Sequence, residues 1–176
     1  SIKEQNQNRP AERFENNILA INIEENLPFL LTPDQKRSYQ EIAEDMASGS
    51  PMLRLLQGDV GSGKTIVAAL IAAHVVEDQK QVVILAPTTI LANQHYESFC
   101  EWYGNNENIV LLTSKLPVKE KREIYQKMSD GIVKIIIGTH AVFQDELIYQ
   151  NLSLVIYDEQ HRFGVNQRLK LKEKAN

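Results

Sequence analysis

Gly58-Asp59-Val60-Gly61-Ser62-Gly63-Lys64-Thr65 is the stretch from which the fold can be predicted. It satisfies the pattern G-x-x-x-x-G-K-[ST], which between a strand and a helix is typical of a phosphate-binding loop, or P-loop. An apolar run at 52–56 precedes it and a helical pattern at 64–77 follows it. A chance match in a chain of 176 residues has a probability under about one in a hundred. The alternative is a glycine-rich turn that only connects strand to helix.

These residue types suit a polyanionic ligand such as a triphosphate. Glycines let main-chain N–H groups approach phosphate oxygens closely, and the N-terminus of a helix adds a favourable dipole. We expect Lys64 to reach the β- and γ-phosphates and Thr65 to place its hydroxyl on Mg²⁺. The predicted nucleotide-binding residues of the loop are Gly58, Gly61, Ser62, Gly63, Lys64 and Thr65.

Outward from this loop, short apolar runs alternate with helical patterns. Runs that are apolar at every position suit strands buried on both faces, and the alternation predicts an α/β fold with a mostly parallel sheet and helices on both faces. The segment 141–149 is shorter and less regular. The predicted strands are 52–56, 82–86, 109–112, 132–137 and 152–157, and the predicted helices are 33–48, 64–77, 88–102 and 117–129.

The composition is that of one soluble globular domain, with 43% of residues apolar and 24% charged. We expect the polar residues 1–26 to form a lead-in helix or linker and residues 27–176 to form the domain. A formal net charge of -4 means that any contact with nucleic acid must come from a local patch. The single cysteine, Cys100, fits a reducing compartment, and the apolar stretch 66–76 is too short to span a membrane, so we expect a cytoplasmic protein without membrane contact.

Two acids follow the last predicted strand, where a parallel sheet presents ligand-binding groups. Asp158 is the candidate for holding Mg²⁺ through water, and Glu159 for orienting and polarising the attacking water. Two acids at a strand end are more often a solvated turn, but a phosphate loop elsewhere in the chain reverses that preference. Neither Cys nor His occurs at metal-ligand spacing, so we assign no transition metal.

Several of these strings together resemble the superfamily 2 helicases, and among them the RecG family. The resemblance rests on 57–65 and on Asp158-Glu159-Gln160-His161-Arg162-Phe163-Gly164-Val165, with further similar strings at 27–32, 86–88 and 138–141. It implies the first of two RecA-like motor domains, ATP with Mg²⁺ as ligand, and ATP-driven remodelling of branched DNA in repair and recombination. It also implies Lys64 and Glu159 as catalytic residues, and Gln160 and His161 as residues that couple the nucleotide state to the DNA side.

Other residues take expected roles from the same resemblance. Gln35 corresponds to a glutamine that reads the adenine edge, although Thr32 and Gln35 also form a capping box at the start of a helix. Small hydroxyls at strand-to-helix turns suit phosphate contacts and plain helix caps alike. The residues that resemble DNA-backbone contacts are Pro87, Thr88, Thr89, Thr113, Thr139 and His140.

One segment departs from the family's pattern. Leu112-Thr113-Ser114-Lys115 stands where RecG-like sequences have a glycine after the threonine. Loss of that glycine restricts close approach of the backbone to a strand, although the charge of Lys115 can compensate. The DNA contact at Thr113 is therefore the least secure of those transferred.

We therefore expect the N-terminal motor domain of a RecG-type helicase, cut from a longer chain that also holds a second RecA-like domain and a wedge domain. In isolation it should bind Mg·ATP weakly, hydrolyse it slowly and unwind nothing. One alternative is the motor of a double-stranded DNA translocase of the Mfd type, whose motifs are similar. Another is a nucleotide-gated interaction module that does not bind DNA, which the presence of Glu159 argues against.

Overall fold

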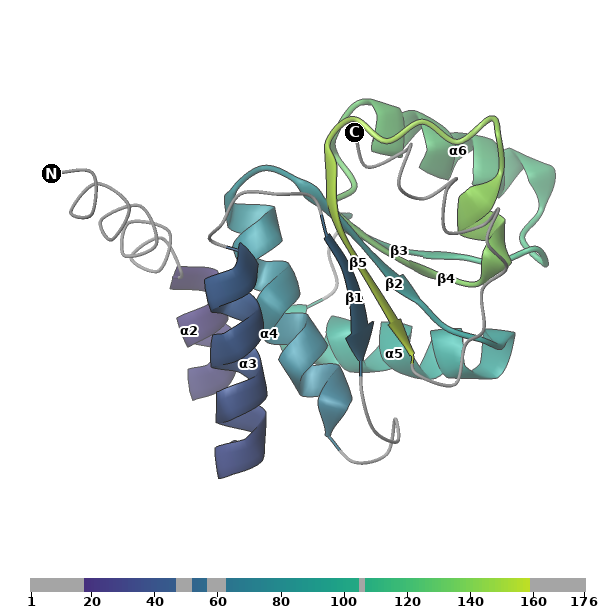
Figure 1. The fold of residues 1–176 in the computed structure, drawn as a ribbon. Helices are drawn as coiled ribbons and strands as arrows, with labels where there is room; N and C mark the ends of the chain where they lie inside the picture. Colours follow the sequence, from purple (N-terminus) through teal and green to yellow (C-terminus); the bar gives the residue numbers. More distant parts are fainter. Residues whose placement is uncertain (1–17, 47–51, 57–62, 105–106, 159–176) are drawn as a thin grey trace, which may run out of the picture.

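Five parallel strands form one sheet in the order β1-β5-β2-β4-β3 (Figure 1). The structure, a computed structural model, describes residues 18–46, 52–56, 63–104 and 107–158. The α/β fold with a parallel sheet is therefore confirmed. The strands are β1 (Met52–Leu56), β2 (Gln81–Leu85), β3 (Ile109–Leu112), β4 (Ile135–Gly138) and β5 (Leu152–Asp158).

The helices cover both faces of the sheet (Figure 1). The chain crosses the sheet in one direction through α4 and α5, which pack on one face, and returns through α6 and η2 on the other. This is the arrangement that right-handed crossovers between parallel strands require. The helices are α2 (Ile18–Glu25), α3 (Pro33–Met46), α4 (Lys64–Glu77), α5 (Thr89–Tyr103), α6 (Val118–Ser129) and the 3₁₀ turn η2 (His140–Phe143).

The predicted strand 132–137 begins three residues late. The amide groups of Ile132 and Val133 donate to the carbonyl of Lys127 at 2.9 and 3.2 Å, so they close the end of α6 and do not join the sheet. Gly131, with a φ of 77°, makes the turn that allows this. An apolar run alone does not distinguish strand residues from residues that close the end of a helix, of which Ile132 is exposed and Val133 buried.

Alternate residues of the strands pack into two separate hydrophobic cores, one on each face of the sheet. Val82 and Ile84 face the core beneath α4, whereas Val83 and Leu85 face the core beneath α6 and η2. Helix α4 is buried around most of its circumference because α2 and α3 cover its outer side. Ala20 and Ile23 of α2 are part of that core, so the predicted lead-in does contain a packed helix; the domain boundary at 26/27 stays a prediction.

A buried glutamine organises the amino ends of the strands. The Gln81 side chain donates to the carbonyls of Met128 and Val133, each at 2.9 Å, and accepts a hydrogen bond of 2.9 Å from the amide of Asn151. Burial of this side-chain amide costs little free energy, because its oxygen and its nitrogen both form hydrogen bonds. Gln81 thereby joins β2 to the end of α6 and to the residues before β4 and β5.

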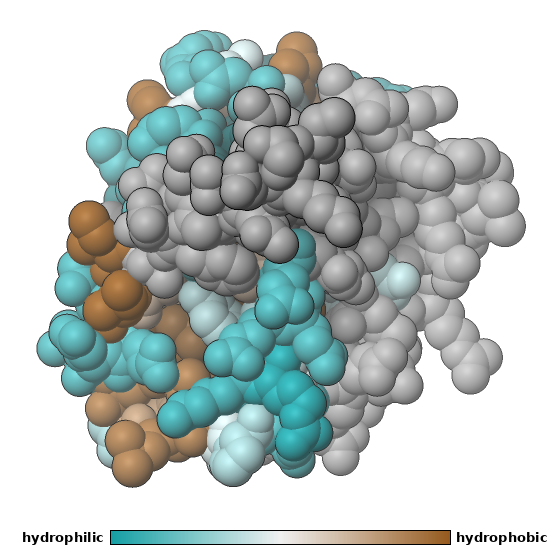
Figure 2. Space-filling model, turned by 60° about the vertical axis from the view of Figure 1, so that its left-hand side comes forward, coloured by the Kyte–Doolittle hydropathy of each residue, from teal (hydrophilic) through white to brown (hydrophobic). Residues whose placement is uncertain are grey.

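The carboxyl ends of all five strands lie along the opposite edge. Leu56 pairs with Asp158, Leu85 with Tyr157 and Gly138, and Leu112 with Gly138. On the face of the molecule that Figure 2 shows, both polar and hydrophobic residues reach the surface. In the part of the chain that is described, no helix is long and apolar enough to cross a membrane. The large hydrophobic residues that are exposed are Ile18, Ile21, Phe29, Leu30, Ile90, Val118, Ile132 and Ile148.

Candidate nucleotide-binding site

Gly63 caps the N-terminus of α4 in a left-handed conformation, with φ 86° and ψ 12°. Residues with a Cβ rarely adopt this conformation, whereas glycine does so without steric cost. The half-buried Lys64 is the first residue of α4, as predicted. The first turn of this helix therefore supplies main-chain N–H donors and a positive dipole end beside one ammonium group. Gly58, Gly61 and Ser62 lie outside the described residues.

The hydroxyl of Thr65 lies against α5. Its Oγ1 is 3.3 Å from Nδ1 of His95, and the two side chains are 8% and 2% exposed. His95 is a functional candidate that the sequence reasoning missed. Its signal was present, because Ala92, His95 and Phe99 recur at helical spacing and form the buried side of α5. A polar residue in such a stripe requires a polar partner.

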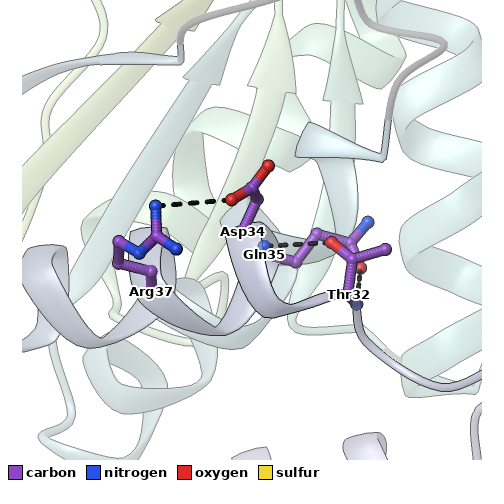
Figure 3. A network of polar contacts seen from close by, with 4 residues as sticks. All are labelled: Thr32, Asp34, Gln35 and Arg37. Atoms are coloured by element: carbon purple, nitrogen blue, oxygen red, sulfur yellow. Dashed lines mark hydrogen bonds and ion pairs between the residues drawn. The ribbon is translucent and has the colours of Figure 1, made fainter.

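Gln35 forms the predicted capping box at the start of α3. Its main-chain N–H donates to Thr32 Oγ1 at 3.1 Å, and its Oε1 accepts from the Thr32 N–H at 2.9 Å (Figure 3). Its Nε2 donates at 3.1 Å to the carbonyl of Gly63. The amide that caps α3 thus also contacts the residue that caps α4. Capping is confirmed, and the adenine contact stays a prediction.

An exposed ion pair of 3.4 Å joins Asp34 to Arg37 one turn along α3 (Figure 3). Such pairs on a helix surface contribute little to stability.

A partly buried contact joins Tyr39 of α3 to His74 of α4. The Tyr39 hydroxyl forms a hydrogen bond with Nε2 of His74, and the two rings stack at 5.6 Å between centroids. Burial lowers the pKa of His74, and the nearby Glu77 and Asp78 oppose this effect only in part. The contact joins α3 to α4, and the lowered pKa favours the neutral form of His74.

The acidic end of β5 lies next to the end of β1, the strand that precedes the phosphate loop in the sequence. Strands β1 and β5 are neighbours, and the register pairs Leu56, the last residue of β1, with Asp158. The last residue of β1 and the acid that ends β5 therefore lie side by side at the same edge of the sheet. A hydroxyl and a carboxylate are hard oxygen donors, which Mg²⁺ prefers. Glu159, Gln160 and His161 lie outside the described residues.

The segments with predicted DNA contacts meet at the same edge, on the other side of β5. The amide of Ala86 donates to the carbonyl of Gly138 at 2.8 Å, and the amide of Thr139 donates to the carbonyl of Leu112 at 3.4 Å. The turns after β2, β4 and β3 are therefore adjacent. These turns carry Pro87, Thr88, Thr89, Thr139, His140 and Thr113.

The side chains of these residues differ in exposure. Thr88 is exposed and caps α5, because its Oγ1 accepts a 3.2 Å hydrogen bond from the amide of Leu91. His140 is exposed as well. Thr113 and Thr139 are buried, and among the described residues Thr139 Oγ1 has no hydrogen-bond partner. Thr88 and His140 can reach DNA directly, whereas the two buried threonines would need a local rearrangement to expose their hydroxyls.

Comparison with known proteins agrees with this geometry. The DEAD/DEAH box helicase family matches residues 32–176, and the chain belongs to that family. Its relatives include the ATP-dependent DNA helicase RecG of Aquifex aeolicus (strain VF5), 50% identical over 154 residues that cover 86% of this chain and 19% of the relative. Another is the RecG of Pasteurella multocida (strain Pm70), 49% identical over 85% of this chain and 22% of the relative.

A solved structure, of RecG bound to a three-way DNA junction, is similar with a TM-score of 0.74 and 46% identity, over 83% of this chain and 20% of that one. The resemblance to RecG and the RecA-like motor fold are thereby confirmed. Family membership implies ATP binding. The chain spans about a fifth of the length of these relatives.

Proposed function

We propose that this chain is the ATP-binding first motor domain of a RecG-type DNA helicase, which couples ATP hydrolysis to remodelling of branched DNA such as stalled forks. The observation that supports this most is the adjacency of β1 and β5. It puts the end of β1, the strand that precedes the phosphate loop, beside the end of β5 at Asp158. Binding of a triphosphate requires main-chain N–H donors, a lysine ammonium group and an acid that holds the metal ion, all close together.

In this proposal each residue of the site has a separate task. The loop amides and Lys64 bind the β- and γ-phosphates, and Thr65 and Asp158 hold Mg²⁺, which when bound offsets charge on those phosphates. Glu159 orients and polarises the water that attacks the terminal phosphorus. Gln35 contacts the adenine edge with the second amide hydrogen and the oxygen lone pair that its bonds to Gly63 and Thr32 leave available. Phosphoryl transfer depends chiefly on positioning and electrostatic stabilisation, and these groups supply both.

The turns after β2, β3 and β4 form the surface that binds DNA in this proposal. Pro87, Thr88, Thr89, Thr139 and His140 contact the sugar-phosphate backbone, and Thr113 does so less securely. Backbone contacts of this kind position the protein without reading sequence, which suits an enzyme that recognises branched structure. Gln160 and His161 pass the state of the nucleotide to these turns. The second RecA-like domain and the wedge domain of the parent chain complete the DNA track and split the fork.

The proposal is tested with the full-length parent protein. ATP hydrolysis is measured with forked and with linear duplex DNA, for the unmodified protein, Lys64→Ala and Glu159→Gln. We expect stronger stimulation by the fork, loss of nucleotide binding in Lys64→Ala, and retained binding with reduced turnover in Glu159→Gln. If both variants hydrolyse ATP at the parent rate, the site assignment is wrong.

The same assays address the alternatives, neither of which the comparisons favour. Equal stimulation by linear duplex would favour a translocase of the Mfd type. Binding of DNA through phosphate contacts releases counterions and therefore weakens as salt rises. If the protein shows no such salt-dependent binding, a nucleotide-gated module is favoured. Residues 1–176 tested apart from the rest of the parent chain should unwind nothing, because in this proposal the second motor supplies arginines to the γ-phosphate; a missing arginine finger costs about 10³ to 10⁵ in rate in GTPases.

A further inference from the structure

We propose that His95 is a positioning residue for the cation that accompanies the nucleotide: its Nδ1 holds the hydroxyl of Thr65 in the orientation that metal binding requires. This inference rests on the proposed function, because it concerns the same Mg²⁺ site. It starts from the 3.3 Å contact between Thr65 Oγ1 and His95 Nδ1, two atoms 30 residues apart in the sequence.

A threonine hydroxyl has one proton and two lone pairs. To bind a cation it must present a lone pair, so its proton has to point elsewhere and needs an acceptor. Unprotonated Nδ1 of a neutral imidazole is such an acceptor. A hydrogen bond from the hydroxyl to Nδ1 therefore fixes the hydroxyl's rotation and increases the negative charge on its oxygen. Groups that hold metal ligands in this way commonly change metal affinity by about 10- to 100-fold when they are removed.

The surroundings of His95 hold it in place. His95 is 2% exposed, on the buried side of α5 with Phe99. Phe99 stacks on Tyr103 with 5.7 Å between ring centroids and 5° between ring planes. The Tyr103 hydroxyl in turn donates to the carbonyl of Ala69 in α4. Helices α4 and α5 are thus joined at a second point, about two turns along α5 from His95, which restricts movement of the imidazole away from Thr65.

A simpler role for His95 would be to satisfy a buried polar group without any effect on metal binding. The two roles differ in what removal of the imidazole changes. If His95 only packs, its loss lowers stability and weakens nucleotide binding equally with and without metal. If His95 orients Thr65, its loss weakens only the part of the affinity that depends on metal.

The experiment measures the affinity of the full-length protein for ADP in excess Mg²⁺ and in EDTA. His95→Leu removes the acceptor, whereas His95→Asn keeps a polar acceptor near the position of Nδ1. We expect His95→Leu to reduce the Mg²⁺-dependent gain in affinity by about 10-fold or more, with unchanged affinity in EDTA, and His95→Asn to restore most of the gain. An unchanged gain in His95→Leu, or an equal loss in both media, would overturn the inference.

A second measurement does not depend on folding of the variants. In ¹⁵N NMR spectra of the unmodified protein, the Nδ1 resonance of His95 should be that of an unprotonated nitrogen that accepts a hydrogen bond. It should shift when Mg²⁺ is added to the ADP complex. A protonated Nδ1, or no response to Mg²⁺, would contradict the inference. If the unmodified protein shows no metal-dependent gain for ADP, the proposed function itself fails, and this inference with it.

Discussion

The side-chain amide of Gln35 donates a 3.1 Å hydrogen bond to the main-chain carbonyl of Gly63. This bond joins the first turn of α3 to the residue that caps α4. The side-chain oxygen of Gln35, Oε1, accepts a hydrogen bond from the amide of Thr32. One side chain thus stabilises two helix starts, of which one lies in the phosphate loop. Capping of α3 and the position of Gly63 are therefore physically linked at Gln35, and variants can separate the cap from the predicted contact with the nucleotide.

Gln35→Glu should separate these two functions. Glutamate at this position retains an oxygen that can accept from Thr32, as in the usual capping box, but it cannot donate to the carbonyl of Gly63. We expect α3 to stay capped, stability to urea to fall by about 1–3 kcal/mol because a carboxylate then faces the carbonyl of Gly63, and ADP affinity to fall clearly. Thr32→Ala is the matched control, because it removes the cap at a cost of about 1 kcal/mol and leaves the contact with Gly63 possible. Equal ADP affinity in Gln35→Glu and the parent would mean that Gln35 acts only as a cap.

Gly63→Ala should impair both folding stability and nucleotide binding. The φ of 86° is unfavourable for alanine by about 1–2 kcal/mol, and the added Cβ would lie 2.1 Å from Gln35 Nε2. The Gln35 amide would have to move, which breaks its bond to Gly63. Urea unfolding and ADP titration measure the two effects.

Gly131→Ala is a closely matched control for this change. Gly131 has a φ of 77°, and a Cβ there would meet the side-chain amide of Gln150 at 1.9 Å. Gly131 follows α6 at the opposite edge of the sheet from the phosphate loop. It should lose similar stability but keep ADP affinity. A parallel loss of ADP affinity in both variants would indicate that stability alone explains the effect at Gly63.

Thr88 allows the helix-cap role and the DNA role to be separated. Thr88→Asp should keep α5 capped, because aspartate is a good N-cap residue and its charge suits the helix dipole. The same charge should repel DNA phosphates, so DNA affinity should fall while stability is kept. Thr88→Ala should lower stability by about 1 kcal/mol. Unfolding curves and fork titrations over a salt series measure these effects, and normal fork binding by Thr88→Asp would exclude Thr88 from the DNA contact.

The free energy of unfolding should decrease as the pH is lowered, because of His74. Burial lowers its pKa in the folded protein, so below its ordinary value of 6.5 the unfolded chain takes up the proton first. The contribution of His74 is therefore full above about pH 6.5 and is lost as the pH falls toward the lowered value. His74→Gln should reduce this slope, whereas Tyr39→Phe should retain it because burial is the main cause. An unchanged slope in His74→Gln would disprove the assignment.

Local patterns were sufficient to predict much of the fold. Helix α4 begins at Lys64 and ends at Glu77 as expected, because the loop and the apolar run define both ends. The start of β4 was predicted wrongly, since the main-chain bonds of Ile132 and Val133 depend on how α6 ends. The pattern of the chain also implied that the carboxyl ends of the strands share one edge, and the register of Leu56 with Asp158 agrees.

Contacts between distant helices were harder to predict. His95 and Thr65 come from helices whose facing sides depend on the packing of the whole sheet, and the same holds for Tyr39 and His74. Gln35 was predicted in two roles because a capping glutamine and a ligand-binding glutamine have the same local sequence. The third contact of Gln35, with Gly63, follows only from the packing of α3 on α4.

The most direct test of a shared triphosphate site is the position of the cation. Crystals of the protein with a non-hydrolysable ATP analogue and Mn²⁺ would reveal the metal by its anomalous scattering. We expect the Mn²⁺ peak between the hydroxyl of Thr65 and the carboxylate of Asp158, with the β- and γ-phosphates against the ammonium of Lys64. A cation or phosphates bound elsewhere, with Lys64 and Asp158 in separate environments, would contradict the nucleotide site and the motor function that depends on it.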